Sequence, residues 1–307
     1  MGREGRPQTR ALTGRAALSP VRLTFELTSD AAQFGVRTDA LLTERIERNI
    51  MATLVANVRA GGIAGPQPLF GIGLDSRGQV AAAAMRIPPF PLLCTELGAA
   101  ESDALFNARK LVSAWLARDS ELPGVGATTI TARAIAAVWS DLRGGTSRCR
   151  MREAMHSLTE VREPPRPAPG RLRAAEPGER PLLSSWLRDF VLEAGVDGVD
   201  QVSAIVERQI ARRRLFLWED AGVPRCYVSI SAMVAGVVRL GPVYTPPADR
   251  CRGYASSAVA AVSRRALMSG ADRCMLLTDM SNPTSNKIYA DVGYERFGSW
   301  EDYAFER

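Results

Sequence analysis

The sequence predicts an α/β (α+β) fold with a mixed central sheet flanked by helices, organised as two similar domains in tandem. Residues 171–307 alternate helix and strand patterns, residues 21–163 repeat that order more weakly, and a proline-rich segment lies between them. This segment, residues 164–170, holds four prolines in seven positions, which exclude helix and central strand and make a stiff, extended linker. A chain of 307 residues is long enough for two such domains.

The second half has the clearer pattern. Apolar residues at helical spacing predict a helix over 180–194 that ends at Gly195, and Asp200 is a suitable N-cap for a second helix. The remaining expected elements are strands over 215–219, 226–236 and 237–244, a helix over 256–269, a buried strand over 273–278, a helix over 282–291 and final strands over 294–305.

The first half repeats this order of elements without a clear sequence repeat. The expected elements are a strand over 21–28, a helix over 41–58, strands over 70–74, 79–87 and 92–97, helices over 104–116 and 131–142, and a strand over 151–161. Trp115 and Trp139 fall on helices and are expected in the core, and His156 is expected to be structural.

Composition excludes several classes of protein. The net charge is +6, but the basic residues are scattered along the chain, which argues against nucleic-acid binding. Five cysteines without a CxxC pair and a single histidine predict no metal site and no disulfide framework, which fits a reducing cytoplasm. No apolar run approaches the ~20 residues of a membrane span. Residues 1–20 are basic, lack the apolar core of a secretory signal, and are expected to be a disordered leader.

A basic glycine loop follows the strand that ends at Val243 and Tyr244. It consists of Arg250, Cys251, Arg252, Gly253, Tyr254 and Ala255, and a helix begins at once behind it. The unpaired N–H groups of a first helical turn and its partial positive charge favour phosphate oxygens. Glycine permits close approach of the backbone, and the two arginines add positive charge. The loop is therefore a candidate pyrophosphate cradle.

A second signal follows the buried strand over 273–278. Asn282 suits the N-cap of a short helix and Pro283 its first position. Ser285 and Tyr289 follow on that helix, and Gly293-Tyr294 ends it. By itself this pattern is also compatible with plain capping and a packed tyrosine.

Together the two segments resemble the GNAT superfamily, the Gcn5-related N-acetyltransferases. Arg250, Gly253 and Ala255 match the family's Arg/Gln-x-x-Gly-x-Gly/Ala motif. The family's second signature is matched at Asn282, Ser285, Tyr289, Gly293 and Tyr294. The resemblance covers residues 171–307, and residues 21–163 look like the degenerate half of tandem-GNAT bacterial proteins.

The resemblance implies an acyltransferase that moves an acetyl group from acetyl-CoA to a primary amine of a small molecule or peptide, without a metal. Val243 and Tyr244 would bind the pantetheine arm as an added strand would, and backbone amides of residues 250–255 would bind the pyrophosphate. Asn282 would contact the cofactor or hold the turn, and Ser285 would contact the cofactor. Tyr289 would face the cofactor sulfur and stabilise or protonate the departing thiolate.

Several points stay open at this stage. Asp279, Glu219 and Tyr244 are candidates for a general base, and none is assigned. Trp186, Phe190 and Glu193 are nominated for the acceptor pocket, while the acceptor itself is not readable from the sequence. A non-catalytic acyl-CoA sensor or interaction module is the alternative function. A monomer or a homodimer is expected, with no nucleic-acid or membrane partner.

The first half departs from the pattern at one position. After the strand over 92–97 the segment 98–103 is acidic and has no arginine, at the place where a phosphate loop would lie. Negative charge there repels a pyrophosphate. The first half is therefore expected not to bind coenzyme A, but to pack against the second half and shape the acceptor pocket.

Overall fold

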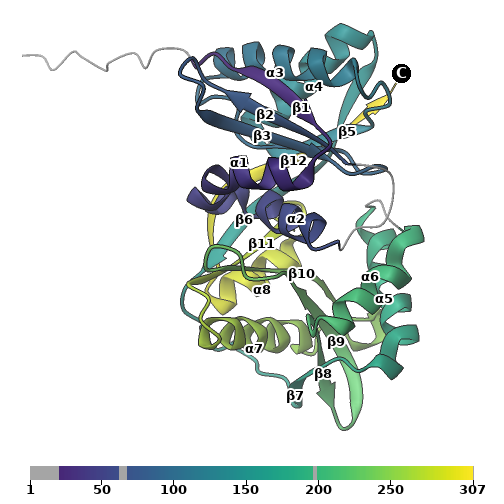
Figure 1. The fold of residues 1–307 in the computed structure, drawn as a ribbon. Helices are drawn as coiled ribbons and strands as arrows, with labels where there is room; N and C mark the ends of the chain where they lie inside the picture. The colour runs from purple at the N-terminus through teal and green to yellow at the C-terminus, as the bar shows by residue number, and fades with distance from the viewer. Residues whose placement is uncertain (1–20, 62–67, 196–198, 307) are drawn as a thin grey trace, which may run out of the picture.

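The computed structural model describes residues 21–61, 68–195 and 199–306, and the predicted leader, residues 1–20, lies outside them. All twelve strands of this part form one sheet, in the order β1-β2-β3-β4-β5-β12-β6-β11-β10-β9-β8-β7. Helices cover both faces of the sheet (Figure 1). The predicted mixed α/β fold is confirmed.

The first half contributes six strands and four α-helices. Its elements are β1 (Thr24–Thr28), α1 (Ala31–Glu44), a 3₁₀ turn (Ile46–Arg48), α2 (Asn49–Arg59), β2 (Leu69–Leu74), β3 (Val80–Arg86), β4 (Leu92–Cys94), α3 (Glu101–Leu116), β5 (Gly124–Thr128), α4 (Thr129–Arg143) and β6 (Thr146–Leu158). Asp30 caps α1 by accepting from the N–H groups of Ala32 and Gln33.

The second half has the same order of elements. They are β7 (Arg171–Ala174), a 3₁₀ turn (Pro177–Glu179), α5 (Arg180–Ala194), a 3₁₀ turn (Val199–Gln201), α6 (Val202–Ala211), β8 (Leu215–Asp220), β9 (Val223–Ile230), β10 (Val237–Tyr244), a 3₁₀ turn (Pro247–Asp249), α7 (Tyr254–Met268), β11 (Arg273–Asp279), α8 (Pro283–Val292) and β12 (Glu295–Glu306). Gly195 and Gly293 end their helices in the left-handed conformation that glycine favours.

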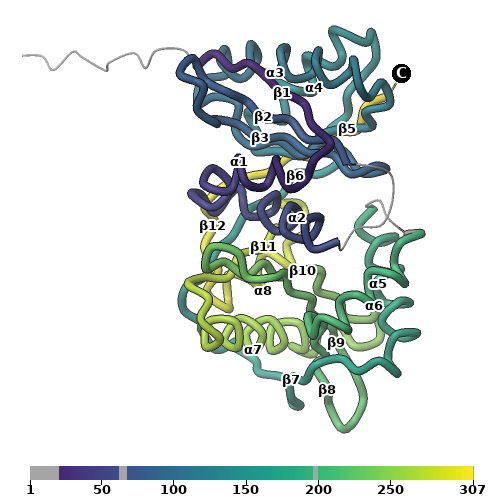
Figure 2. The backbone as a smooth tube through the Cα atoms, in the orientation of Figure 1, coloured from purple at the N-terminus to yellow at the C-terminus, as the bar shows by residue number. Residues whose placement is uncertain are grey.

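The two halves exchange their last strands. Strand β12, from the second half, pairs with β5 and β6, and β6, from the first half, pairs with β11 and β12. The C-terminal end of the chain consequently lies in the first half, near β5 and α4, and the tube trace shows this return (Figure 2). The boundaries 21–163 and 171–307 stay a prediction for independent folding units, because strand pairing crosses between them.

Separate apolar clusters lie on the two faces of the sheet. In the first half α3 and α4 pack on one face, with Trp115 and Trp139 buried as expected, and α1 and α2 pack on the other. In the second half α7 and α8 cover one face and α5 and α6 the opposite face. A fifth cluster joins the halves, and its buried members are Ile50, Met155, Val237, Met275 and Trp300.

Some elements differ from the sequence-based expectations. Helix α1 and strand β7 were not predicted, the helix expected over 41–58 is split by the 3₁₀ turn, and the last strands are one strand of twelve residues. Strand β7 is a short edge strand whose pairing with β8 is decided by long-range contacts. Local pattern alone does not reveal such an element.

Candidate active site

Strands β10 and β11 start side by side and then separate. Their parallel pairing includes only Val237–Arg239 with Arg273–Met275, although β10 continues to Tyr244 and β11 to Asp279. On its other edge β10 pairs with β9 as far as Tyr244, with an irregularity between Leu240 and Val243. The two strands therefore splay apart, and the β11-facing edge of β10 beyond Arg239 is left unpaired by β11.

The glycine loop lies at the end of this splay. Gly253, with φ of 80°, is the N-cap of α7, and Cys251 also has a positive φ, of 62°. Within the described part of the chain, the main-chain N–H groups from Cys251 to Ser256 have no protein acceptor, and the first of α7's ordinary bonds is Ser257 N–H to the Gly253 carbonyl at 3.0 Å. The predicted cradle therefore has a series of main-chain N–H donors without protein acceptors, which suits a phosphate.

The arginines of the loop are partly paired with acids. Arg250 forms an ion pair with Glu193 of α5 at 2.7 Å, and Glu193 also accepts from the Tyr244 hydroxyl at 3.1 Å. Arg252 lies 3.6 Å from Asp249. These contacts reduce the charge available to a ligand, so the backbone donors are the stronger part of the cradle. Tyr254, by contrast, is buried, and its hydroxyl donates to Asp220 at 2.7 Å.

The proline-rich linker packs against the start of α7. The Ala168 N–H donates to the Ser257 hydroxyl at 2.8 Å, and the Trp218 indole N–H donates to the Pro169 carbonyl at 2.8 Å. A Cβ on Gly253 would lie 2.7 Å from the carbonyl oxygen of Arg166. Gly253 is thus required by its own backbone angle and by the linker, in addition to any ligand.

The second predicted motif forms the short helix α8. The Asn282 side chain accepts from the Ser285 N–H at 3.1 Å, so both residues build the helix cap. Tyr289 is half-buried on α8 and packs in the same cluster as Val243 and Ala255. Its hydroxyl has no hydrogen-bond partner among the residues with described positions, and burial raises the pKa of Tyr289. A protonated phenol without a hydrogen-bond partner among the described residues therefore lies beside the loop and the splay.

Two buried hydroxyls near the splay were missed by sequence reasoning. The Thr245 oxygen, just after β10, has no oxygen or nitrogen partner in the described structure, and only the Cys226 thiol lies near it. The Tyr227 hydroxyl is equally unpaired and belongs to a small, mostly apolar cavity between α5, α6 and the sheet. Buried polar groups normally find partners, so the unpaired Tyr227 hydroxyl at this cavity marks a position where a ligand or water fits. The sequence could not indicate these positions, because a single Thr or Tyr in a strand pattern does not show whether its hydroxyl is paired.

The side chains of the three earlier candidates for a general base form hydrogen bonds with other protein groups. Asp279 accepts from the N–H and the hydroxyl of Ser281, at 2.8 and 2.7 Å, and so caps the turn before α8. Glu219 accepts from Arg173 at 2.5 Å, and this hydrogen bond lowers the pKa of Glu219. For Tyr244, burial and then the hydrogen bond to Glu193 raise the pKa.

The nominated acceptor residues are distributed over α5. Trp186 is buried and stacks with Tyr227 at 6.4 Å between ring centroids, and Phe190 packs on the same cluster. Glu193 instead joins the Arg250 and Tyr244 network. Trp186 therefore packs behind Tyr227, which lines the cavity, while Glu193 contacts the loop.

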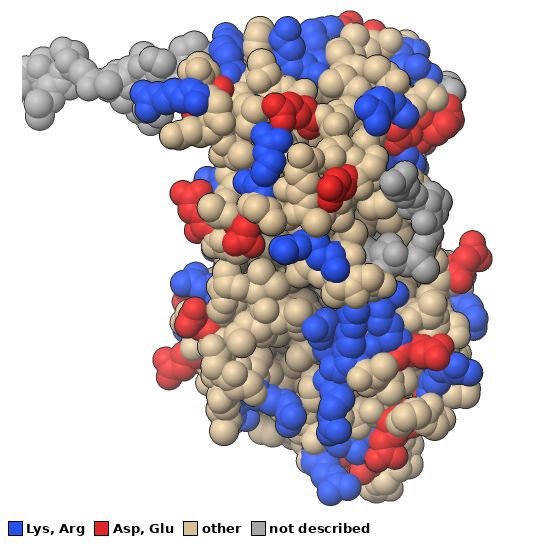
Figure 3. Space-filling model, viewed as in Figure 1, with Lys and Arg blue, Asp and Glu red and all other residues tan. Residues whose placement is uncertain are grey.

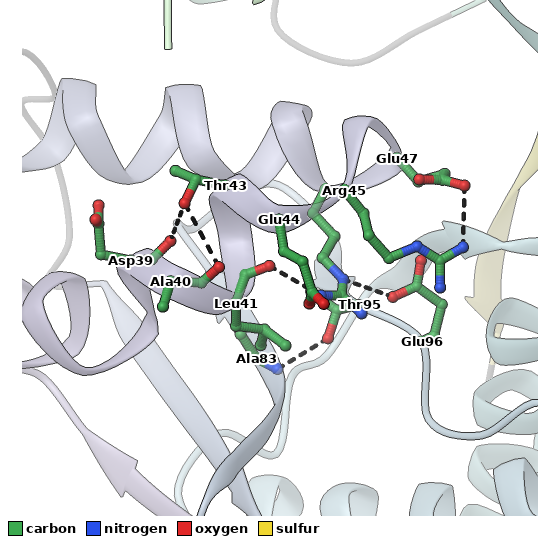
Figure 4. Close-up of polar contacts among 11 residues, drawn as sticks. Asp39, Ala40, Leu41, Thr43, Glu44, Arg45, Glu47, Ala83, Thr95 and Glu96 are labelled. Carbon is green, nitrogen blue, oxygen red and sulfur yellow. Dashed lines mark hydrogen bonds and ion pairs between the residues drawn. The ribbon is translucent and has the colours of Figure 1, made fainter. Parts of the chain in front are cut away.

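The corresponding place in the first half is closed by its own side chains. Glu96, two residues after β4, accepts from Arg48 at 2.8 Å, and Arg48 also donates to Glu44 and to the Leu41 carbonyl. Figure 4 labels the three acceptor residues Leu41, Glu44 and Glu96. The Leu97 N–H donates to the Thr131 hydroxyl at 3.1 Å. Helix α3 then starts with two acidic residues in its first turn. That this half does not bind coenzyme A stays a prediction.

Several further observations bear on the chemistry. Among the described residues, no group of three His, Cys, Asp or Glu side chains could hold a metal ion. No helix in the described ranges is long and apolar enough to cross a bilayer. The five cysteines are free thiols, and His156 is buried in β6.

Comparisons with known proteins agree with this geometry. Residues 230–303, which include both motifs, match the family model of FR47-like protein. An acetyltransferase of the GNAT family from Colwellia psychrerythraea superposes with a TM-score of 0.56 at 11% identity, covering 92% of this chain and 100% of the other. A GCN5-related N-acetyltransferase from Sphaerobacter thermophilus gives 0.54 at 15% identity, covering 91% and 95%. Comparison with curated proteins by sequence gives no match.

The fold is therefore that of the GNAT acetyltransferases, and the resemblance found in the motifs is confirmed. The arrangement is the tandem one. A tandem GNAT protein from the clavulanic acid biosynthesis pathway superposes over 92% of this chain and 98% of its own, with a TM-score of 0.56 and 14% identity.

Proposed function

We propose that the second half of this chain transfers an acetyl group from acetyl-CoA to a primary amine of a small molecule or peptide. The observation that carries the proposal is the run of unpaired main-chain N–H groups from Cys251 to Ser256 at the start of α7. Such a group of donors at a helix N-terminus suits a diphosphate. The free edge of β10 offers amide partners to the pantetheine arm.

Charge on the surface also favours an anionic co-substrate. Lys and Arg side chains gather on the second half in the face shown (Figure 3). Arg208 and Arg214, around the end of α6, have no acidic partner among the described residues, and burial together with Arg212 lowers the pKa of each. Uncompensated positive charge of this kind attracts phosphorylated ligands.

Tyr289 favours a transferase over a non-catalytic acyl-CoA sensor. Transfer to an amine releases a thiolate, and a protonated phenol can donate a hydrogen bond or proton to it. The hydroxyl has no structural partner in the described part of the chain, so simple packing does not account for it. A sensor would need the cradle but not this group.

The first test of the proposal is binding of acetyl-CoA. Calorimetry on the full chain is compared for Cys251→Asn and Cys251→Asp, because both residues tolerate the left-handed backbone at this exposed position. The added negative charge of the aspartate should weaken binding about tenfold relative to asparagine, about 1.4 kcal/mol. No heat of binding with the unmodified protein would overturn the proposal, and equal affinities of the two variants would place the diphosphate elsewhere.

The second test is turnover. Release of free thiol from acetyl-CoA is followed over a panel of amines, amino acids, aminoglycosides and peptides. Turnover with at least one amine supports the transferase. Tight binding without turnover across the panel supports the sensor. A cytoplasmic location and a monomeric or homodimeric state stay predictions.

A further inference from the structure

Four charged side chains gather on one face of the sheet beside the splay. Asp279 of β11, Glu153 of β6 and Trp300 of β12 are directly opposite one another across three adjacent strands, so their side chains share a face. Arg239, paired with Met275, lies on that same face at the last position before β10 and β11 separate. Asp302, two residues beyond Trp300, accepts from the Trp300 indole N–H at 3.1 Å.

This face is opposite the one that holds Tyr289. Met155, Met275 and Trp300 belong to the cluster under α2, whereas Tyr289 packs in the cluster formed by α7 and α8. A thioester held in the gap between β10 and β11 would therefore have Tyr289 on one side. On the other side it would have the group of Glu153, Asp279, Asp302 and Arg239.

Of the three carboxylates in this group, that of Glu153 accepts no hydrogen bond from the described residues. It is half-buried, and among the described residues the charges of Asp302, Arg239 and Asp279 act on it without a hydrogen bond. Asp279 caps the turn at Ser281, and Asp302 accepts from Trp300. Arg239 acts on Glu153 by its charge, and its own buried Nε has no acceptor in the described structure.

The surroundings favour proton transfer near neutral pH. Burial, followed by the charge of Asp302 and with a smaller contribution from Asp279, raises the pKa of Glu153 to about 8, while Arg239 opposes the shift. A base works best when its pKa lies near the working pH. An ordinary exposed glutamate, with a pKa of ~4.3, would be a much weaker base.

We propose that Glu153 is the general base that takes a proton from the acceptor amine, and this rests on the proposed acetyltransferase function. The Glu153 carboxylate first takes one proton from the ammonium form of the amine, which predominates at neutral pH, and the neutral nitrogen then forms a bond to the thioester carbonyl carbon. The carbon–sulfur bond then breaks, and the thiolate receives a proton from Tyr289. The nitrogen of the adduct loses its second proton to water, Tyr289 is reprotonated from water, and Glu153 releases its proton to water, so the products are the amide, the free thiol and one proton.

The origin of Glu153 gives the strand exchange a role in the chemistry. Strand β6 belongs to the first half of the chain but lies between β11 and β12 of the second. The half that closes its own ligand site thereby supplies a reacting group to the other half. The second half by itself would hold the cradle and Tyr289 without a base.

The experiment is a pH profile of kcat/KM for the full chain and its Glu153→Gln variant. The substrates are acetyl-CoA with the fastest primary alkylamine from the amine panel, and acetyl-CoA with hydroxylamine, which is neutral at neutral pH. With the alkylamine we expect a loss of about 100-fold and disappearance of the rise in rate near pH 8. With hydroxylamine the loss should be much smaller, because this nucleophile attacks without losing a proton first.

Controls separate this proposal from the function on which it depends. Glu295→Gln removes an exposed carboxylate from the neighbouring strand β12 and should leave both profiles unchanged. Calorimetry should give the same acetyl-CoA affinity for Glu153→Gln as for the unmodified chain. If the unmodified chain neither binds acetyl-CoA nor turns over, the acetyltransferase function fails, and the base with it. If it turns over and Glu153→Gln keeps its rate and profile, only the role of Glu153 is overturned.

A second variant decides the matter if Glu153→Gln does not fold. Arg239→Gln removes the positive charge that opposes the shift of Glu153, so the rise in rate should move to higher pH. An unmoved profile would show that the titrating group is not Glu153.

Discussion

The carbonyl oxygen of Arg166 lies 2.7 Å from the point where a Cβ on Gly253 would sit. The proline-rich linker is therefore in contact with the loop proposed to hold the diphosphate. Because Gly253 also has φ of 80°, two independent effects oppose any side chain at this position.

We predict that Gly253→Ala destabilises the chain by about 2–3 kcal/mol, as backbone strain adds to displacement of the linker. Gly222→Ala is the matched control, since Gly222 has φ of 77° but no atom within 4 Å of its would-be Cβ. Gly222→Ala should cost only about 1 kcal/mol. Urea denaturation measures both, and equal losses would show that the linker contact contributes nothing.

The role of Tyr289 is tested by removing its hydroxyl. Tyr289→Phe should slow turnover about 10–100-fold and leave acetyl-CoA affinity and stability nearly unchanged, because the hydroxyl has no partner among the described residues. Steady-state kinetics and calorimetry are the measurements. Full activity in this variant would remove Tyr289 from the mechanism.

Tyr294 provides the control for that experiment. Its ring packs edge-on against Tyr289 at 6.0 Å, and its hydroxyl shares a buried hydrogen bond of 2.8 Å with Ser263. Tyr294→Phe should therefore cost about 1 kcal/mol of stability without a comparable fall in turnover. The two phenylalanine variants thus separate chemistry from packing.

The raised pKa of Glu153 predicts that the stability of the protein depends on pH. The pKa of Glu153 in the folded state is raised from 4.5 to about 8, so folding favours the protonated form. The stabilisation is fully present below pH 4.5 and is lost as pH rises towards 8. Glu153→Gln should lack this loss and should be more stable than the unmodified chain at pH 9, by about 2 kcal/mol after allowance for solvent screening. Denaturation at pH 5 and pH 9 checks this, and parallel changes in the two proteins would contradict it.

The exchange of β6 and β12 predicts how fragments behave. Residues 164–307 expressed alone lack β6, so β11 and β12 lose the strand that joins them. We expect this fragment to be unfolded or aggregated, and co-expression with residues 1–163 to restore a soluble pair that melts cooperatively. Circular dichroism and size-exclusion chromatography measure both outcomes. A well-folded isolated fragment would mean that each half is independent after all.

Local features were predicted well from the sequence. The loop at Arg250–Ala255, the Asn282 cap of α8 and the acidic segment after β4 depend on residues within a few positions of one another. Capping, turns and helix N-termini are determined over that range, which is why their motifs can be recognised. The missed strand β7 depends instead on pairing with β8, some 45 residues further along the chain.

The candidate site shows the same difference between features set by local sequence and features set by long-range packing. Asp279, Glu219 and Tyr244 were the candidate bases, yet Asp279 is held by Ser281 in the same turn, and Glu219 and Tyr244 are hydrogen-bonded to residues of other elements. Glu153 was not considered, because nothing in its local pattern distinguishes it. Only the register of β6 against β11 brings it to the face beside the splay.

The sequence by itself determined the class of fold, the open helix N-terminus at Gly253 and the capped helix that carries Tyr289, since these follow from short-range backbone chemistry. The tertiary structure decided which strand lies next to which, and with it the exchange between halves and the position of Glu153. Strand pairing is formed by backbone groups that every residue carries, so its partners are chosen by packing over the whole sheet rather than by any local motif.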